Sequence, residues 1–179
     1  NMQKFCSDNN IVLDKTNDWN SCYNFCTQNK VDLIITLGDS RIVPGYVVNK
    51  FKTIGNHGAV LPAVQGGASL VWGRMINTGE WGISIMEIHE KVDQGNILKI
   101  KTFSYDDNTS EEQFTKLADN LTVETLIEVL KGDFTIMQNH KWQVRITKNT
   151  DSYTASEILK LCIQNNIPIY MPPRTPADG

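Results

Sequence analysis

A continuous aliphatic run at residues 33–37, Leu-Ile-Ile-Thr-Leu, is the feature that most restricts how this chain can fold. A run of this length without polar alternation is typical of a parallel strand that is covered on both faces. Around it, strand-like runs alternate with segments of helical spacing, which is the pattern of α/β domains. The sequence predicts strands at residues 11–13, 33–37, 52–57, 81–88, 96–105 and 167–171, and helices at residues 18–29, 68–78, 110–130 and 156–165. Residues 44–49 are expected to form a short helix or a turn.

Two residues with acid/base chemistry stand at the ends of successive predicted strands. His57 ends the strand at residues 52–57, and Asp93 follows the strand at residues 81–88. Open α/β sheets place their sites at strand ends. An imidazole beside a carboxylate can transfer protons near neutral pH. The sequence therefore predicts His57 and Asp93 as a catalytic pair.

Three blocks of the chain, in order and at compatible spacing, carry a resemblance to a known family. Residues 55–66 read Gly-Asn-His-Gly-Ala-Val-Leu-Pro-Ala-Val-Gln-Gly, residues 92–98 read Val-Asp-Gln-Gly-Asn-Ile-Leu, and residues 31–38 read Val-Asp-Leu-Ile-Ile-Thr-Leu-Gly. The first block resembles the signature Asn-x-His-Pro-Ser-Leu-Leu-Pro-x-x-Arg/Lys-Gly of the folate-dependent formyltransferases. The other two are similar to that family's Asp-x-Gly block and to its aliphatic strand before glycine.

The resemblance covers roughly residues 11–131 and implies both a fold and an activity. The fold would be a Rossmann-like α/β domain, with a mostly parallel sheet flanked by helices. The activity would be transfer of a formyl group from 10-formyltetrahydrofolate to a primary amine of a small molecule, with a nucleotide-linked amino sugar as the first choice. His57 would donate a hydrogen bond or proton to the reacting carbonyl group, and Asp93 would keep the imidazole charged.

Two departures from the signature lie beside His57. The family's catalytic asparagine stands two residues before the histidine, where this chain has Gly55, and Asn56 occupies the intervening position. Alternate side chains of a strand face opposite sides, so Asn56 is expected to point away from His57 unless the strand is bulged. Asn56 either substitutes in catalysis through such a distortion or leaves the role vacant. In addition, Gln65 replaces the usual basic residue.

The resemblance also implies where the folate would lie. The pterin would enter a slot between two loops, held by backbone atoms and covered by apolar side chains. Backbone recognition tolerates side-chain change, so folate binding is expected even without the asparagine. The residues that would form the slot are Arg41, Ile42, Val43, Ile88, Glu90 and Val92.

The domain organisation follows from the extent of the match. Residues 1–131 are predicted to be the catalytic domain, with its first βαβ unit missing because no glycine-rich turn precedes residue 11. Either the protein is a shortened relative or the sequence is a fragment. Residues 132–179 are predicted to be a C-terminal extension with a helix and a proline-rich end. Its last residues, 173–179, resemble the Arg-Thr-Pro-Glu-Asp-Gly tract that follows the family's catalytic domain.

Composition restricts the partners and the location. A formal net charge of −3 argues against nucleic acid, because a phosphate backbone favours a basic surface. No run of apolar residues predicts a membrane span and no signal peptide is indicated, so the cytoplasm is expected. Cys22 and Cys26 lie one helical turn apart without a nearby histidine, and no metal site is predicted because zinc sites use four ligands. The oligomeric state is not indicated.

Two other functions remain open. Gly55 and Gln65 are also compatible with a non-catalytic folate-binding or scaffold protein descended from such enzymes. The same His57 and Asp93 pair could instead activate water and hydrolyse the formylated folate.

Overall fold

The computed structural model describes residues 2–13, 15, 17–39 and 41–173 and divides the chain into two compact units, residues 1–32 and 33–179. The first unit contains α1 (Met2–Asp8) and α2 (Trp19–Gln28). The side chain of Asp18 accepts the Ser21 N–H at 2.9 Å and caps α2, which confirms the helix predicted at residues 18–29.

The strand predicted at residues 11–13 is wrong. Ile11, Val12 and Leu13 are exposed and form no strand. A strand needs a neighbour to satisfy its backbone groups, and the described residues of the first unit contain only the two helices besides loops.

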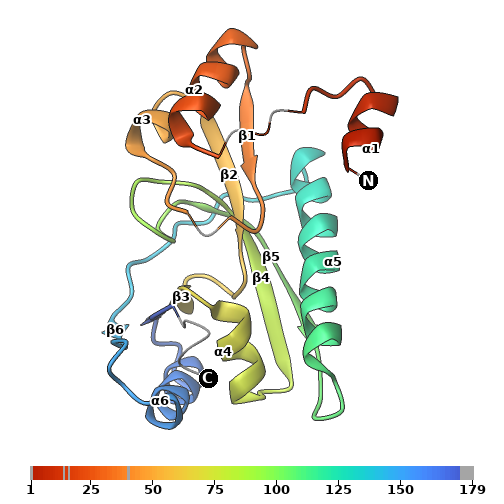
Figure 1. Cartoon of the computed structure of the whole chain (residues 1–179). Helices are drawn as coiled ribbons and strands as arrows, with labels where there is room; N and C mark the ends of the chain where they lie inside the picture. Colours follow the sequence, from red (N-terminus) through yellow and green to blue (C-terminus); the bar gives the residue numbers. More distant parts are fainter. Residues whose placement is uncertain (1, 14, 16, 40, 174–179) are drawn as a thin grey trace. The chain divides into compact units, whose positions relative to one another are not determined.

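The main sheet of the second unit is mixed and has four strands in the order β1-β2-β4-β5 (Figure 1). They are β1 (Leu33–Thr36), β2 (Lys52–His57), β4 (Glu80–Glu87) and β5 (Ile97–Ser104). β1 runs parallel to β2, whereas β2 with β4 and β4 with β5 are antiparallel. All four strands were predicted close to these bounds. Between β1 and β2, where a short helix or a turn was expected, the chain forms the short helix α3 (Gly45–Val48).

The expectation that residues 33–37 are covered on both faces is wrong. Ile34 is buried, but Ile35 on the opposite face is 39% exposed and Leu37 is 45% exposed. β1 is an edge strand of the described sheet, and an unbroken aliphatic run carries no alternation from which a half-exposed edge strand can be recognised.

The long helix α5 (Glu111–Leu130) packs against β4 and β5. Ser110 and Gln113 form a reciprocal capping box at its start, and Glu111 and Glu112 lie in the first turn. After the helix, Gly132 adopts a φ of +85°, which favours glycine and ends the helix as predicted.

A second, parallel sheet joins the middle of the chain to its later part, in the order β3-β7-β6. Its strands are β3 (Val64–Gly66), β7 (Ile169–Met171) and β6 (Val144–Arg145). The helices α4 (Ser69–Ile76) and α6 (Ser152–Gln164) pack on one another beside this sheet (Figure 1). Helix α6 begins four residues before its predicted start because Asp151 accepts the Thr154 N–H and caps it.

Residues beyond 131 belong to the same core as the residues before it. Trp72 from α4, Leu159 from α6 and Ile169 from β7 are fully buried in one cluster. The later helix and strand complete the core around α4, and the two compact units divide between Asp32 and Leu33. The domain boundary at residue 131 stays a prediction. The proline-rich tract expected at residues 173–179 lies, after Pro173, outside the described residues. No helix in the described part of the chain combines the length and apolarity needed to cross a membrane.

Candidate active site

His57 is the last residue of β2, and its imidazole is only 7% exposed. Its Nε2 lies 2.9 Å from the carbonyl oxygen of Val64. A carbonyl oxygen only accepts hydrogen bonds, so Nε2 carries a proton and donates a hydrogen bond to the Val64 carbonyl oxygen. The other ring nitrogen, Nδ1, lies 3.5 Å from Oδ1 of Asp93. Both nitrogens therefore face protein groups, one in β3 and one in the turn between β4 and β5.

Asp93 occupies that turn with a φ of +53°, in the left-handed region. Its Oδ2 accepts the N–H of Gly66 at 2.7 Å, while Oδ1 faces His57. Two residues later, a Cβ on Gly95 would lie 1.9 Å from the carbonyl oxygen of Glu87, so only glycine lets the turn approach β4 so closely. The Asp-x-Gly pattern is thus explained by backbone packing, and the carboxylate side chain reaches the imidazole.

The structure does not bring Asn56 to His57. β2 pairs with β4 in continuous register from Ile54 to His57, without a bulge that would turn Asn56 to the other face. Its Oδ1 instead accepts the N–H of Gly38, beyond the end of β1, at 3.3 Å. Asn56 therefore lies on the face opposite the imidazole, as strand alternation predicts, and the catalytic role suggested for it has no geometric support.

The position of the family's asparagine is filled by neighbouring side chains. A Cβ built on Gly55 would lie 2.5 Å from Oγ1 of Thr36 and 2.8 Å from Cδ1 of Ile88. Both distances are far shorter than an ordinary van der Waals contact. A larger residue at Gly55 therefore requires Thr36 and Ile88 to move.

The loop of residues 41–43, predicted to hold the folate from one side, has some side chains exposed and others buried. Arg41 forms a bidentate ion pair with Asp39, with Nη2 and Oδ2 2.6 Å apart, and this pairing lowers the pKa of the Asp39 carboxyl. Ile42 is 64% exposed, whereas Val43 is buried. From the other predicted side, Val92 is 43% exposed. These four residues do not converge on a common cavity among the cavities described below.

The remaining two predicted folate-binding residues, Ile88 and Glu90, do line a hollow of about 490 Å³. Glu90 accepts a hydrogen bond from the Asn49 amide at 2.8 Å. This size lies within the range of small-molecule sites. A neighbouring hollow of about 240 Å³ shares part of its wall. The residues that line the first hollow, called the β4–β5 hollow below, are Val48, Asn49, Ile88, His89, Glu90, Lys91 and Gln94.

Gln65, in place of the family's basic residue, is fully buried. Its Nε2 donates to the carbonyl oxygens of His140 at 2.7 Å and Pro62 at 3.2 Å. The N–H groups of the two glycines that follow are also engaged within the protein. The Gly66 N–H is bound by Asp93, and the Gly67 N–H donates to the Met171 carbonyl oxygen at 3.1 Å.

Two polar residues near His57 and Asp93 were not predicted from the sequence. Ser84 is fully buried opposite His57 and holds the following loop, accepting the Leu61 N–H at 3.0 Å and donating to the Ala59 carbonyl oxygen at 2.8 Å. Asn139 donates to the carbonyl oxygen of Asp93 at 2.7 Å. Ser84 lies within the alternating strand at residues 81–88, but only its pairing with β2 reveals the role.

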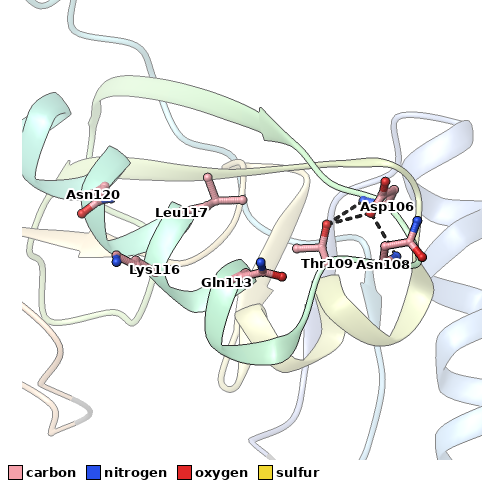
Figure 2. Close-up of a pocket in the computed structure, with 7 residues that line it drawn as sticks. All are labelled: Asp106, Asn108, Thr109, Gln113, Lys116, Leu117 and Asn120. Atoms are coloured by element: carbon pink, nitrogen blue, oxygen red, sulfur yellow. Dashed lines mark hydrogen bonds between the residues drawn. The ribbon is translucent and has the colours of Figure 1, made fainter.

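A further hollow of about 540 Å³ lies where β5 leads into α5 (Figure 2). Asp106 there accepts hydrogen bonds from Thr109 and Asn108, which shape the turn before the helix. None of the predicted site residues lines it. The residues that do are Asp106, Asn108, Thr109, Gln113, Lys116, Leu117 and Asn120.

Residues 13–130, well over half of the chain, match the profile of the family described as formyl transferase. The chain belongs to this family. The match includes β1 to β5 and α5, and therefore His57 and Asp93, and it ends before Asn139 and the residues of β6, α6 and β7.

One relative is the methionyl-tRNA formyltransferase of Limosilactobacillus fermentum. It is 31% identical over 124 residues, which cover 66% of this chain and 39% of that protein. A second, from Mycoplasma capricolum, is 24% identical and covers 84% of this chain and 50% of that protein. The chain thus spans 39% and 50% of the length of these two relatives.

Solved structures share the fold. HypX from Aquifex aeolicus in complex with tetrahydrofolic acid superposes with a TM-score of 0.61 at 23% identity, covering 84% of this chain and 29% of that one. These neighbours confirm the Rossmann-like formyltransferase fold expected from the sequence.

Proposed function

We propose that this chain transfers a formyl group from 10-formyltetrahydrofolate to a primary amine of a small molecule. The observation that carries the proposal is the approach of His57 Nδ1 to Asp93 Oδ1 at 3.5 Å, made by residues far apart in the sequence. Membership of the formyl transferase family supports the reaction class. A nucleotide-linked amino sugar is the first choice of substrate, since a sugar N-formyltransferase crystallised with dTDP and 5-N-formyl-tetrahydrofolate shares the fold.

The β4–β5 hollow fits a folate in chemical character. It combines the apolar Ile88 with amide and carboxylate groups of Asn49, Glu90 and Gln94 that can pair with a pterin ring. When bound, 10-formyltetrahydrofolate would supply the formyl group. In this proposal Ile88 and Glu90 bind the folate, while Arg41, Ile42, Val43 and Val92 lie outside the cavity wall.

Proton movement is the task left to the chain's own residues. Formylation removes one proton from the attacking amine and adds one proton to the nitrogen from which the formyl group departs. His57 is the group that can carry it, with Asp93 stabilising the charged imidazole. Because both ring nitrogens now face protein groups, the imidazole has to exchange either the Val64 carbonyl oxygen or Asp93 for the substrate.

The decisive experiment follows tetrahydrofolate release from 10-formyltetrahydrofolate by the protein, with and without a panel of primary amines. Amine-dependent release accompanied by a formylated product is the expected result. Release that is independent of amines would assign hydrolysis instead. Absence of release under all conditions contradicts both catalytic functions.

One alternative has its own structural support. The burial of His57, the pairing of both its nitrogens and the filled position beside Gly55 also suit a folate-binding protein without catalysis. Titration with a stable folate analogue separates this function from a scaffold. Gln94→Trp should fill the β4–β5 hollow and abolish saturable binding, whereas Gln164→Trp, at an exposed position in α6, should bind as the wild type does. Binding without turnover would establish the alternative.

A further inference from the structure

The segment that follows α5 returns to the candidate active site and is fixed there by a short backbone bridge. Met137 and Ile97 exchange two hydrogen bonds, Ile97 N to Met137 O at 2.9 Å and Met137 N to Ile97 O at 2.8 Å. Ile97 begins β5, directly after the turn that carries Asp93. The bridge therefore holds the next residues of the segment beside that turn.

Asn139, two residues after the bridge, binds the turn itself. Its Nδ2 donates to the carbonyl oxygen of Asp93 at 2.7 Å. The φ of +53° at Asp93 is unfavourable for a residue with a Cβ, so this turn needs contacts that hold it. The contact to the Asp93 backbone leaves both carboxylate oxygens of Asp93 for Gly66 N–H and His57.

His140, the residue after Asn139, contacts β3, the other segment that binds His57 and Asp93. The carbonyl oxygen of His140 accepts the Nε2 of buried Gln65 at 2.7 Å. Gln65 lies in β3 between Val64, whose carbonyl oxygen binds His57, and Gly66, whose N–H binds Asp93. Residues 139 and 140 thus connect the two segments that hold His57 in place.

Asn139 also has a feature that packing alone does not explain. Its Oδ1 is buried and has no hydrogen-bond partner among the residues that the structure describes. A buried acceptor without a partner is unfavourable, and an apolar side chain of similar size would avoid it. The amide is therefore better explained by the N–H that it presents to Asp93.

We propose that Asn139 is a positioning residue: it holds the Asp93 turn so that the carboxylate faces His57 and Gly66. The inference rests on the proposed function for its catalytic consequence, but the positioning itself is independent of it. Asn139 lies outside the part of the chain that matches the family profile.

The Gly66 amide proton reports the position of Asp93 directly, since it is bound by Oδ2. In Asn139→Ala, hydrogen exchange at Gly66, measured by NMR on the whole chain, should accelerate by about tenfold, the factor that one hydrogen bond is worth. Asn139→Gln keeps the donor and should restore part of the protection. The matched control is Asn165→Ala, which removes an amide donating to the Leu161 carbonyl oxygen at 2.8 Å at the end of α6 and should leave Gly66 unchanged.

Turnover provides the second measurement. If the wild type releases tetrahydrofolate in the presence of amines, Asn139→Ala should lower kcat by about tenfold with KM unchanged, since positioning acts on the transition state and not on binding. If the wild type shows no turnover, the proposed function fails while the Gly66 exchange still decides the positioning. If Asn139→Ala does not fold, Asn139→Gln decides alone. Exchange of the Gly66 amide within about threefold of the wild-type rate supports the positioning role, and faster exchange contradicts it. A factor of about three corresponds to half the free energy of one hydrogen bond.

Three results would overturn the inference. The first is unchanged Gly66 exchange in folded Asn139→Ala. The second is equal acceleration in Asn165→Ala, which would show a general loss of stability. The third is a Gly66 amide in Asn139→Gln that exchanges as fast as in the alanine variant.

Discussion

His57 is held by two acceptors of different kinds, a neutral carbonyl oxygen and a carboxylate. The carbonyl fixes a proton on Nε2, and the carboxylate stabilises a proton on Nδ1. The imidazole is therefore fixed in orientation by β3 on one side and by the Asp93 turn on the other. The two residues should therefore act as one unit if the chain is a formyltransferase of the proposed kind.

His57→Ala and Asp93→Asn should each lower turnover by about a hundredfold or more, as expected when a general acid or base is lost. The double variant should be little worse than either single variant, because residues that act as a unit are not additive. The assay is tetrahydrofolate release at saturating amine. Asp119→Asn replaces an exposed aspartate of α5 and should retain full turnover. Losses that multiply in the double variant would reject the shared role.

Gly55→Ala should destabilise the protein by about 1–3 kcal/mol, because the new methyl group meets Thr36 and Ile88 in a filled space. Thr36→Ala removes the nearest atom, so Gly55→Ala should be less destabilising in that background. Urea unfolding of the four proteins of this cycle measures the coupling. An equal effect in both backgrounds would show that Thr36 is not the obstacle.

The sequence predicts several residues of the candidate site, but not the contacts that depend on how distant segments pack. The resemblance identified His57 and Asp93, and strand alternation placed Asn56 on the opposite face. The filling of the space beside Gly55 by Thr36 could not be predicted, because it depends on the register between β1 and β2. The contact of Asn139 with Asp93 depends on tertiary packing for the same reason.

At the scale of elements, α5 is tied to β5 by a small charge network. Glu128 lies between Lys101 and Lys99, with its carboxylate oxygens 2.6 Å and 2.7 Å from the two ammonium groups. Lys99 also binds Asp133, just after the helix, at 2.7 Å. Hydrogen bonds from Lys101 and then Lys99 lower the pKa of Glu128 to about 2.

This pKa determines a pH dependence. An unfolded glutamate titrates near 4.5, so the stabilisation from Glu128 is fully present above that pH and is lost as the pH falls toward about 2. Glu128→Gln should therefore destabilise the protein at pH 7 and have little effect near pH 2. Urea unfolding at several pH values measures the difference, with Glu124→Gln on the same helix as the control. A difference that does not vary with pH would contradict the ion-pair explanation.

The elements that were predicted well have local signals. For α5, Ser110 and Gly132 mark both ends, and its bounds follow. The early start of α6 was missed because its first turn lacks apolar periodicity, although Asp151 is a typical cap. The strand predicted at residues 11–13 shows the opposite error, since apolar residues alone do not supply a partner strand.

Within the unit of residues 33–173, the segment after α5 is part of the core and not an appendage. Leu159 of α6 is fully buried among residues of α4, β3 and β7, whereas Leu161 on the same helix is 58% exposed. The family match ends at residue 130, so residues beyond the matched part complete the hydrophobic core of this unit. One cooperative unfolding transition is expected for this unit.

Leu159→Ala should lower the free energy of unfolding by about 2–5 kcal/mol, the usual effect of deleting a fully buried leucine side chain. Leu161→Ala should stay within about 0.5 kcal/mol of the wild type, as surface substitutions do. Tryptophan fluorescence, to which Trp72 and Trp81 of the same cluster contribute together with Trp19 and Trp142, and far-UV circular dichroism should both report this loss. A separate transition that shifts in Leu159→Ala while the rest of the unfolding curve does not would show that residues 132–173 unfold on their own.

The parallel pairing of β3 with β7 has a consequence for the order in which the chain is made. β3 carries the carbonyl group that binds His57, and it gains its neighbour only from the last strand that the structure describes. During synthesis the N-terminal part of a chain emerges first, and contacts between distant segments form last. A ribosome would therefore release His57 and Asp93 long before Met171, so β3 can pair with β7 only late in the synthesis of this segment.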